Sequence, residues 1–228
     1  MTQATADSQP ITELAEVDSR IPGLYASAPQ PLPFEPSISV RAFLVRRDDG
    51  NVLVYSVDDL GSASAAFDAL GGISRQYLNH GHEAMFSENP VDAPLFVHEA
   101  DAPAVVETRD VRATFSRRHT LDDDFEVIPT PGHTPGATAY LWDAGEHRLL
   151  FTGDSIYLEG GRWKPGLLAS SDRDALIASL ELIRQLDFDV LVPWAAAVGQ
   201  PYHSTTDRTD ARSRIDAMLA RLRRRSSR

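Results

Sequence analysis

The chain has 228 residues, of which 42% are hydrophobic and 24% are charged, as is usual for a globular protein. Its net charge of −11 argues against a general nucleic-acid-binding protein, and no apolar stretch approaches the roughly 20 residues that cross a bilayer. The sequence contains no cysteine, which excludes disulfides, thiolate metal ligands and cysteine nucleophiles. The first 30 residues lack a basic start followed by an apolar core, so no secretory signal is expected.

From these bounds we expect a cytoplasmic protein that has neither a nucleic-acid nor a membrane partner. Any metal ion must be held by His, Asp or Glu side chains. The sequence carries no indication of the oligomeric state.

Residues 1–36 are polar and rich in proline, and we expect a loosely ordered arm before a single domain that spans residues 37–228. Residues 37–46 and 52–57 are rich in β-branched and aromatic side chains and are predicted to form a hairpin. A helix is predicted over residues 62–70, because apolar side chains recur on one face and two glycines follow.

The remaining elements alternate between short apolar strands and amphipathic helices. Strands are predicted at residues 73–78, 94–98, 111–115, 125–128, 137–142, 148–151 and 190–192, helices at 100–107, 172–186 and 207–224, and a loop at 155–168. This order predicts two similar halves, each a sheet covered by helices on its outer side.

Four side chains that can bind a metal ion stand where predicted strands end. Proline and glycine fix the backbone of the loop at residues 129–136, which presents His133. His80 and His82 follow a predicted strand at a spacing of two, so in extended backbone their rings point the same way. Asp154 follows an apolar strand and a glycine that permits close backbone approach. Three imidazoles and one carboxylate suit Zn²⁺ or Fe²⁺ and leave a coordination position open.

The three motifs that carry these residues are His80-Gly-His82, Pro-Gly-His133-Thr-Pro-Gly and Phe-Thr-Gly-Asp154. Together they resemble the metallo-β-lactamase-fold hydrolase superfamily over about residues 37–225. The resemblance implies an α/β protein, a four-layer αββα sandwich with its site at one edge between the sheets. It also implies that the three histidines are the ligands of the family's first metal and that Asp154 is the carboxylate that bridges both metals.

The chain departs from the family pattern at the second metal. The family's Asp and two further His ligands fall on Ala84, Met85 and Ala195, and the Asp that usually ends the early strand is missing near Ser56. The sequence therefore predicts a divergent member with a single metal ion, zinc or alternatively iron, in which Asp154 serves as fourth ligand or as catalytic base.

Two other side chains near these motifs are weaker candidates. His203 is a candidate replacement ligand, although it lies eight residues beyond Ala195. Glu83 is a candidate base, but strand alternation is expected to point its side chain away from the metal.

Three functions follow as hypotheses. The first is a mononuclear metallohydrolase in which metal-bound water attacks an ester, thioester, lactone or amide in a small-molecule substrate. The second is a catalytically degenerate, metal-free relative that binds a ligand or partner, as the lost ligands indicate. The third is a mononuclear iron oxygenase resembling the family's persulfide dioxygenases.

Overall fold

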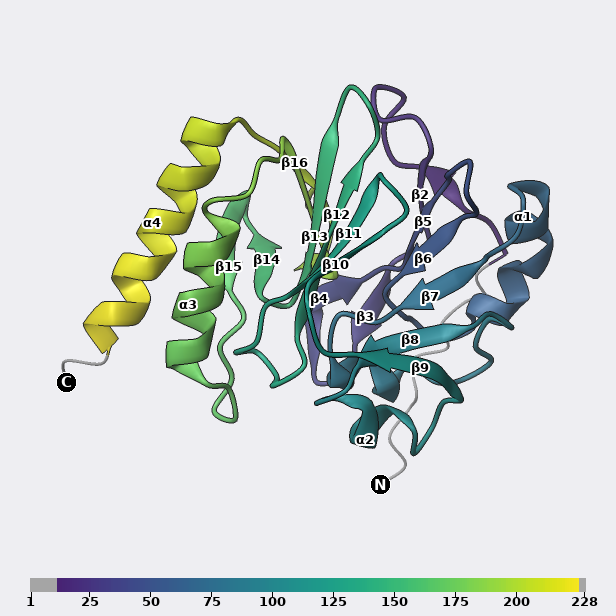
Figure 1. Ribbon diagram of the computed structural model, residues 1–228, viewed down its shortest axis with the longest axis horizontal. Helices are drawn as coiled ribbons and strands as arrows, with labels where there is room; N and C mark the ends of the chain where they lie inside the picture. The colour runs from purple at the N-terminus through teal and green to yellow at the C-terminus, as the bar shows by residue number, and fades with distance from the viewer. Residues whose placement is uncertain (1–11, 226–228) are drawn as a thin grey trace.

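The structure, a computed structural model, describes residues 12–225. Two β-sheets face each other in the middle of the molecule and helices lie on the outer sides, as Figure 1 shows. The four-layer αββα sandwich that was expected is therefore confirmed. None of the helices in the described part of the chain is long and apolar enough to span a membrane.

The first sheet comes from the N-terminal half and has seven strands in the order β1-β2-β5-β6-β7-β8-β9. Strands β6 to β9 run parallel, whereas β5 pairs antiparallel with both of its neighbours. Its central strands β5 and β6 are buried along their whole length, which suits their uninterrupted Val, Leu and Phe side chains. The strands are β1 (Ala15–Glu16), β2 (Leu24–Ala26), β5 (Phe43–Val45), β6 (Val52–Val54), β7 (Arg75–Tyr77), β8 (Leu95–His98) and β9 (Val111–Phe115).

The second sheet has six strands in the order β10-β11-β12-β13-β16-β18. Strands β10 to β13 form an antiparallel meander, and β16 joins β13 in parallel after a helical crossover. These strands are β10 (His119–Leu121), β11 (Phe125–Pro129), β12 (Thr138–Asp143), β13 (Arg148–Gly153), β16 (Val190–Pro193) and β18 (Ser204–Thr205).

A third, smaller sheet has the strand order β15-β14-β17-β4-β3. It joins the β14–β15 hairpin to β17, which comes later in the chain, and β17 in turn pairs with β4 of the N-terminal β3–β4 pair. Its strands are β3 (Gln30–Leu32), β4 (Glu35–Val40), β14 (Ile156–Glu159), β15 (Arg162–Pro165) and β17 (Ala195–Ala197).

Aromatic side chains fill the space between the two large sheets. The rings of Phe43 and Phe151 are 6.2 Å apart, and those of Tyr77 and Tyr140 are 5.3 Å apart. Each pair joins one sheet to the other, and all four side chains are buried. The main core of the protein therefore lies between the sheets.

Helices α3 (Arg173–Ile183) and α4 (Arg208–Arg225) cover the outer face of the six-stranded sheet (Figure 1). Asp172 caps α3 by accepting a hydrogen bond from the backbone N–H of Ala175 at 3.0 Å. The side of the seven-stranded sheet carries the short helices α1 (Ser64–Ala69) and α2 (Ala102–Val105) and the 3₁₀ helices η1 (Leu60–Ala63) and η2 (Gly81–Met85).

The fold differs from the sequence prediction in three places. The expected strand 37–46 is divided, because β4 belongs to the third sheet and β5 to the first. The expected loop 155–168 contains the β14–β15 hairpin. The expected arm 1–36 ends inside β4, and from Ile21 onwards it contributes buried side chains and strands β2 and β3 to two sheets. Residues 1–11 of that arm lie outside the described residues.

Candidate metal centre

His80 and His82 lie where β7 of the first sheet ends. His80 has extended backbone, with φ −156° and ψ 163°, and caps the 3₁₀ helix η2 that contains His82. The two rings converge because the chain turns into a 3₁₀ helix after His80. The prediction of extended backbone for both residues therefore holds for His80 and is wrong for His82. His80 is buried, whereas His82 reaches the solvent-facing side of the site.

His133 lies in the loop between β11 and β12 of the second sheet. Gly132 has φ 141°, and a Cβ there would lie 2.4 Å from the backbone of Leu176 in α3, so only glycine lets the loop approach this helix. The Nδ1–H of His133 donates to the carbonyl of Gly166, 2.8 Å away. This bond fixes the tautomer and leaves the lone pair on Nε2.

Asp154 follows β13 and is held by its backbone. The Asp154 N–H donates to the side-chain oxygen of Asn79 at 3.3 Å. The preceding Gly153 donates its N–H to the hydroxyl of Tyr55, which itself donates to the carbonyl of Val192, both at 2.8 Å. Gly153 has φ 52°, and a Cβ there would meet the Asn79 amide. The turn that presents Asp154 is therefore tied to both sheets.

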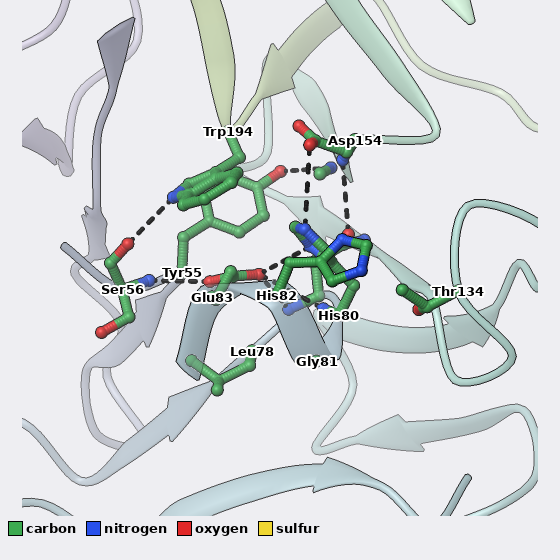
Figure 2. Close-up of polar contacts among 12 residues, drawn as sticks. Tyr55, Ser56, Leu78, His80, Gly81, His82, Glu83, Thr134, Asp154 and Trp194 are labelled. Atoms are coloured by element: carbon green, nitrogen blue, oxygen red, sulfur yellow. Dashed lines mark hydrogen bonds and ion pairs between the residues drawn. The ribbon is translucent and has the colours of Figure 1, made fainter. Parts of the chain in front are cut away.

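These four side chains converge, as Figure 2 shows for His80, His82 and Asp154. One ligand atom from each of the three histidines lies within 4.8 Å of the other two. His82 Nδ1 is 3.1 Å from His133 Nε2. Asp154 Oδ2 is 3.7 Å from His80 Nε2 and 3.6 Å from His133 Nε2.

The donor set fits a tetrahedral metal ion. Two nitrogens that each bind zinc at its usual bond length lie about 3.3 Å apart, close to the 3.1 Å between His82 Nδ1 and His133 Nε2. The Nε2 atom of His80 and the Oδ1 atom of Asp154 are buried without a hydrogen-bond partner among the described residues. Such orphaned atoms cost free energy unless a ligand satisfies them.

The protonation states also suit metal binding. Burial lowers the pKa of His80 to about 3, although Asp154 acts in the opposite direction. Burial, followed by the neighbouring His133, lowers the pKa of His82 as well. Both imidazoles are therefore neutral near pH 7, and neutral imidazole is the form that binds metal.

Glu83 supports the histidine turn, and its carboxylate lies between Ser56 and the histidines in Figure 2. Its carboxylate accepts hydrogen bonds from the backbone N–H groups of Ser56 at 2.8 Å, Asn79 at 2.7 Å and His80 at 3.3 Å. Its Oε1 also lies 3.3 Å from His80 Nδ1. Burial raises the pKa of Glu83 to about 8, although these hydrogen bonds act to lower it. The side chain points away from the cluster, as expected, but because it lies in η2 rather than in a strand.

Asp101, which the sequence did not single out, joins the two histidine loops. Its carboxylate accepts from the N–H of Gly81 at 2.7 Å, the hydroxyl of Thr134 at 2.5 Å and the N–H of Gly136 at 2.8 Å. Gly81 precedes His82, and Thr134 follows His133. No local pattern announces this role, because all three partners are distant in sequence.

The three positions at which the family resemblance leads us to expect ligands of a second metal lie together beside the histidines. Ala84, Met85 and Ala195 line the same pocket of about 740 Å³ as His82, His133 and Asp154. Trp194 also lines it and packs edge-on against His80, with ring centroids 5.2 Å apart. His203 is not brought into the cluster and does not line the pocket.

Comparison with known proteins places these features in a family. The sequence profile described as the Metallo-beta-lactamase superfamily matches residues 69–195, which include both histidine motifs and Asp154. The hydroxyacylglutathione hydrolase of Buchnera aphidicola subsp. Baizongia pistaciae is 41% identical over 73 residues, which are 32% of this chain and 26% of that enzyme. The match thus spans only about a quarter of the length of this curated relative.

Solved structures of low sequence identity share the fold. A metallo-β-lactamase from Hirschia baltica superimposes with a TM-score of 0.67 at 14% identity, covering 94% of this chain and 98% of its own. A metallo-β-lactamase from Pontibacter korlensis gives a TM-score of 0.64 at 15% identity, covering 91% and 98%. With the profile match over more than half of its length, the chain belongs to the metallo-β-lactamase superfamily.

Proposed function

We propose that this protein is a mononuclear metal-dependent hydrolase with His80, His82, His133 and Asp154 as its metal-binding residues. One observation carries the proposal: three histidine ligand atoms from two sheets lie within 4.8 Å of one another, with a carboxylate beside them. His80 and His133 are buried, and His80 Nε2 has no hydrogen-bond partner among the described residues. A bound ion would satisfy this nitrogen and would explain why three imidazoles and a carboxylate converge.

A zinc ion bound by these residues supplies a Lewis acid and lowers the pKa of a coordinated water to about 7. The protein's own contribution is to orient the ligands and to manage a proton. The ring of His133 is fixed through Gly166, and the backbone N–H of His80 is held by Glu83. Asp154 Oδ1, which has no hydrogen-bond partner among the described residues, is available to accept the proton that the attacking water loses.

The reaction class that suits this site is hydrolysis of an ester, thioester, lactone or amide. In each case water adds to a carbonyl carbon, the bond to the leaving group breaks, and the leaving group receives a proton. The similarity to a hydroxyacylglutathione hydrolase adds acylated thiols to the candidates, over the matched quarter of that enzyme. A single ion cannot clamp the attacking and leaving oxygens as a pair of ions does.

Two other functions retain specific support. The apolar residues Ala84, Met85 and Ala195 at the second-metal positions favour a metal-free protein that binds a ligand in the adjacent pocket. Two histidines with one carboxylate, as in His80, His133 and Asp154, also form the ligand set of mononuclear iron oxygenases.

Elemental analysis of protein purified without chelator tests the three functions together. The hydrolase proposal predicts about one equivalent of zinc, and an oxygenase about one equivalent of iron with oxygen uptake on a thiol-derived substrate. His133→Ala is expected to abolish binding, whereas His119→Ala, at an exposed position in β10, serves as the matched control. Less than about a tenth of an equivalent, even after zinc or iron is added, overturns both enzyme functions.

A further inference from the structure

The pocket beside the histidines has the size of a small-molecule site. Its volume is about 740 Å³, and His82, His133 and Asp154 form part of its wall. Pockets of about 300–1,000 Å³ bury most of the surface of a drug-sized ligand. A substrate whose carbonyl reaches the histidines therefore places the rest of its structure in this pocket.

Most of the pocket wall is apolar. The described residues include five large hydrophobic side chains that are exposed, and three of them, Phe34, Met85 and Leu168, line this pocket. Each is more than 45% exposed, so each leaves apolar surface in water that an apolar ligand would cover. The other two, Val106 and Val198, lie elsewhere on the surface.

The residues at the positions expected for second-metal ligands extend this apolar wall towards the reacting group. Ala84 and Ala195 are buried and, with Met85, line the pocket next to the histidines. In the two-metal pattern of the family, an Asp and two His side chains would stand at these positions and hold a cation. Here the same positions present methyl and thioether groups, which suit a hydrocarbon chain.

The charges around the pocket are negative. Its lining includes the carboxylates of Glu35, Asp154 and Glu159 and, among the described residues, no lysine or arginine. Lys164 does not line the pocket but forms an ion pair with Glu159, which compensates the charge of that carboxylate. Glu35 forms no ion pair with another described residue and repels an anion that enters, and such an anion must also give up its hydration against the apolar wall. The net charge of −11 adds to this repulsion at longer range.

We propose that the pocket is an acyl-group subsite that accepts uncharged, apolar acyl chains and discriminates against acyl groups that end in a carboxylate. This inference rests on the proposed hydrolase function and adds the class of substrate. In the reaction, water oxygen bonds to the acyl carbon, the ester C–O bond breaks, and the products are a fatty acid and an alcohol.

Two esters that differ only at the far end of the acyl chain provide the test. They are 4-nitrophenyl hexanoate, which is neutral, and the mono-4-nitrophenyl ester of adipic acid, which carries a carboxylate at that end. With the zinc-loaded protein we expect kcat/KM for the hexanoate to exceed that for the adipate at least about tenfold, which corresponds to about 1.4 kcal/mol. Equal values, or a preference for the adipate, overturn the inference and leave the hydrolase function standing.

A positive charge added to the pocket provides a second test of the acyl-group subsite. Leu168→Arg places a cation in the lining and is expected to raise kcat/KM for the adipate relative to the hexanoate. Val198→Arg makes the same change at an exposed apolar position outside the pocket and is expected to leave the ratio unchanged. An identical shift of the ratio in both variants would show a general charge effect and overturn the assignment of the pocket.

A binding measurement separates failure of the subsite from failure of the proposed function. The neutral fluorophore N-phenyl-1-naphthylamine is bound to the protein and displaced by methyl hexanoate or by monomethyl adipate. We expect methyl hexanoate to displace the fluorophore more strongly than monomethyl adipate does. Leu168→Arg should weaken this preference, and Val198→Arg should leave it unchanged. If metal-loaded protein hydrolyses neither nitrophenyl ester, the proposed hydrolase function is overturned. The displacement measurement still shows whether the pocket prefers uncharged acyl chains. No binding of the fluorophore and no displacement overturns the subsite.

Discussion

The carboxylate of Glu83 accepts a hydrogen bond from the backbone N–H of Ser56, 2.8 Å away. This contact joins the histidine turn to the end of strand β6, where the family pattern has a supporting aspartate and this chain has none. A carboxylate from η2 therefore reaches the strand end from the opposite direction and also accepts from Asn79 and His80. The support of the site is retained although its usual residue is absent.

Glu83→Gln should weaken both the fold and the metal centre. An amide keeps one acceptor oxygen and places an NH₂ group against backbone donors, at an expected cost of about 1–3 kcal/mol in the free energy of unfolding. Loss of such support typically lowers metal affinity about 10- to 100-fold. Urea unfolding of metal-free protein and zinc titration measure the two effects, with the exposed Glu88→Gln as control. Unchanged stability and affinity would contradict the supporting role.

Asp101→Asn should loosen the two histidine loops together. The substitution removes an acceptor from a carboxylate that serves Gly81, Thr134 and Gly136, and the expected loss of unfolding free energy is about 1–3 kcal/mol. Amide hydrogen exchange should accelerate at both Gly81 and Gly136. The exposed Asp110→Asn is the matched control. Acceleration at only one of the two glycines would show that Asp101 does not couple the loops.

Restoring the missing ligands should create a second metal position. The combined variant Ala84→Asp, Met85→His and Ala195→His returns the family's side chains to positions that line one pocket beside Asp154. The metal content is expected to rise from about one to about two equivalents, because Asp154 regains its bridging role. Elemental analysis after dialysis against zinc provides the measurement. A variant that folds and still binds one equivalent would show that the surrounding backbone has diverged from a two-metal arrangement.

The half-buried His203 should make stability depend on pH. Burial lowers its pKa below the ordinary value of 6.5, with Asp18 opposing and Arg20 reinforcing the shift. Protonation therefore opposes folding: the contribution of His203 to stability is present above pH 6.5 and is lost as the pH falls through the lowered pKa.

Comparison of the wild-type protein with His203→Gln isolates this effect. The free energy of unfolding should fall more steeply with decreasing pH in the wild type, by at most about 1.4 kcal/mol per pH unit for one proton. Urea unfolding of chelator-treated protein at several pH values measures the difference in unfolding free energy between the two proteins. The contributions of the other histidines are the same in both proteins and cancel in this difference. Parallel pH profiles for the two proteins would contradict the prediction.

Much of the site could be predicted because its side chains stand in short motifs. His133 lies among prolines and glycines, and Asp154 follows an apolar strand and a glycine, so backbone chemistry marks both positions in the sequence. The family resemblance then supplied the αββα sandwich. Side chains whose role depends on distant partners could not be found in this way. Asp101 contacts groups 20 to 35 residues away, and no periodicity encodes those contacts.

The errors in the predicted elements have a similar cause. Residues 37–46 are rich in β-branched and aromatic side chains throughout, yet the chain crosses between two sheets near Arg41, and the pairing partners decide where each strand lies. Leu24 lies in the expected loose arm, which is polar and rich in proline, yet it is fully buried in β2 against the first sheet. Tertiary pairing overrides local composition at both places.

The candidate ligands come from both halves of the sandwich. His80 and His82 follow a strand of the seven-stranded sheet, whereas His133 and Asp154 follow strands of the six-stranded sheet. An ion bound by all four is a crosslink between the two layers, so its binding free energy also opposes their separation. At about 1,000 times its dissociation constant, such an ion adds about 4 kcal/mol to the free energy of unfolding. The melting temperature of the protein therefore reports how much of it carries metal.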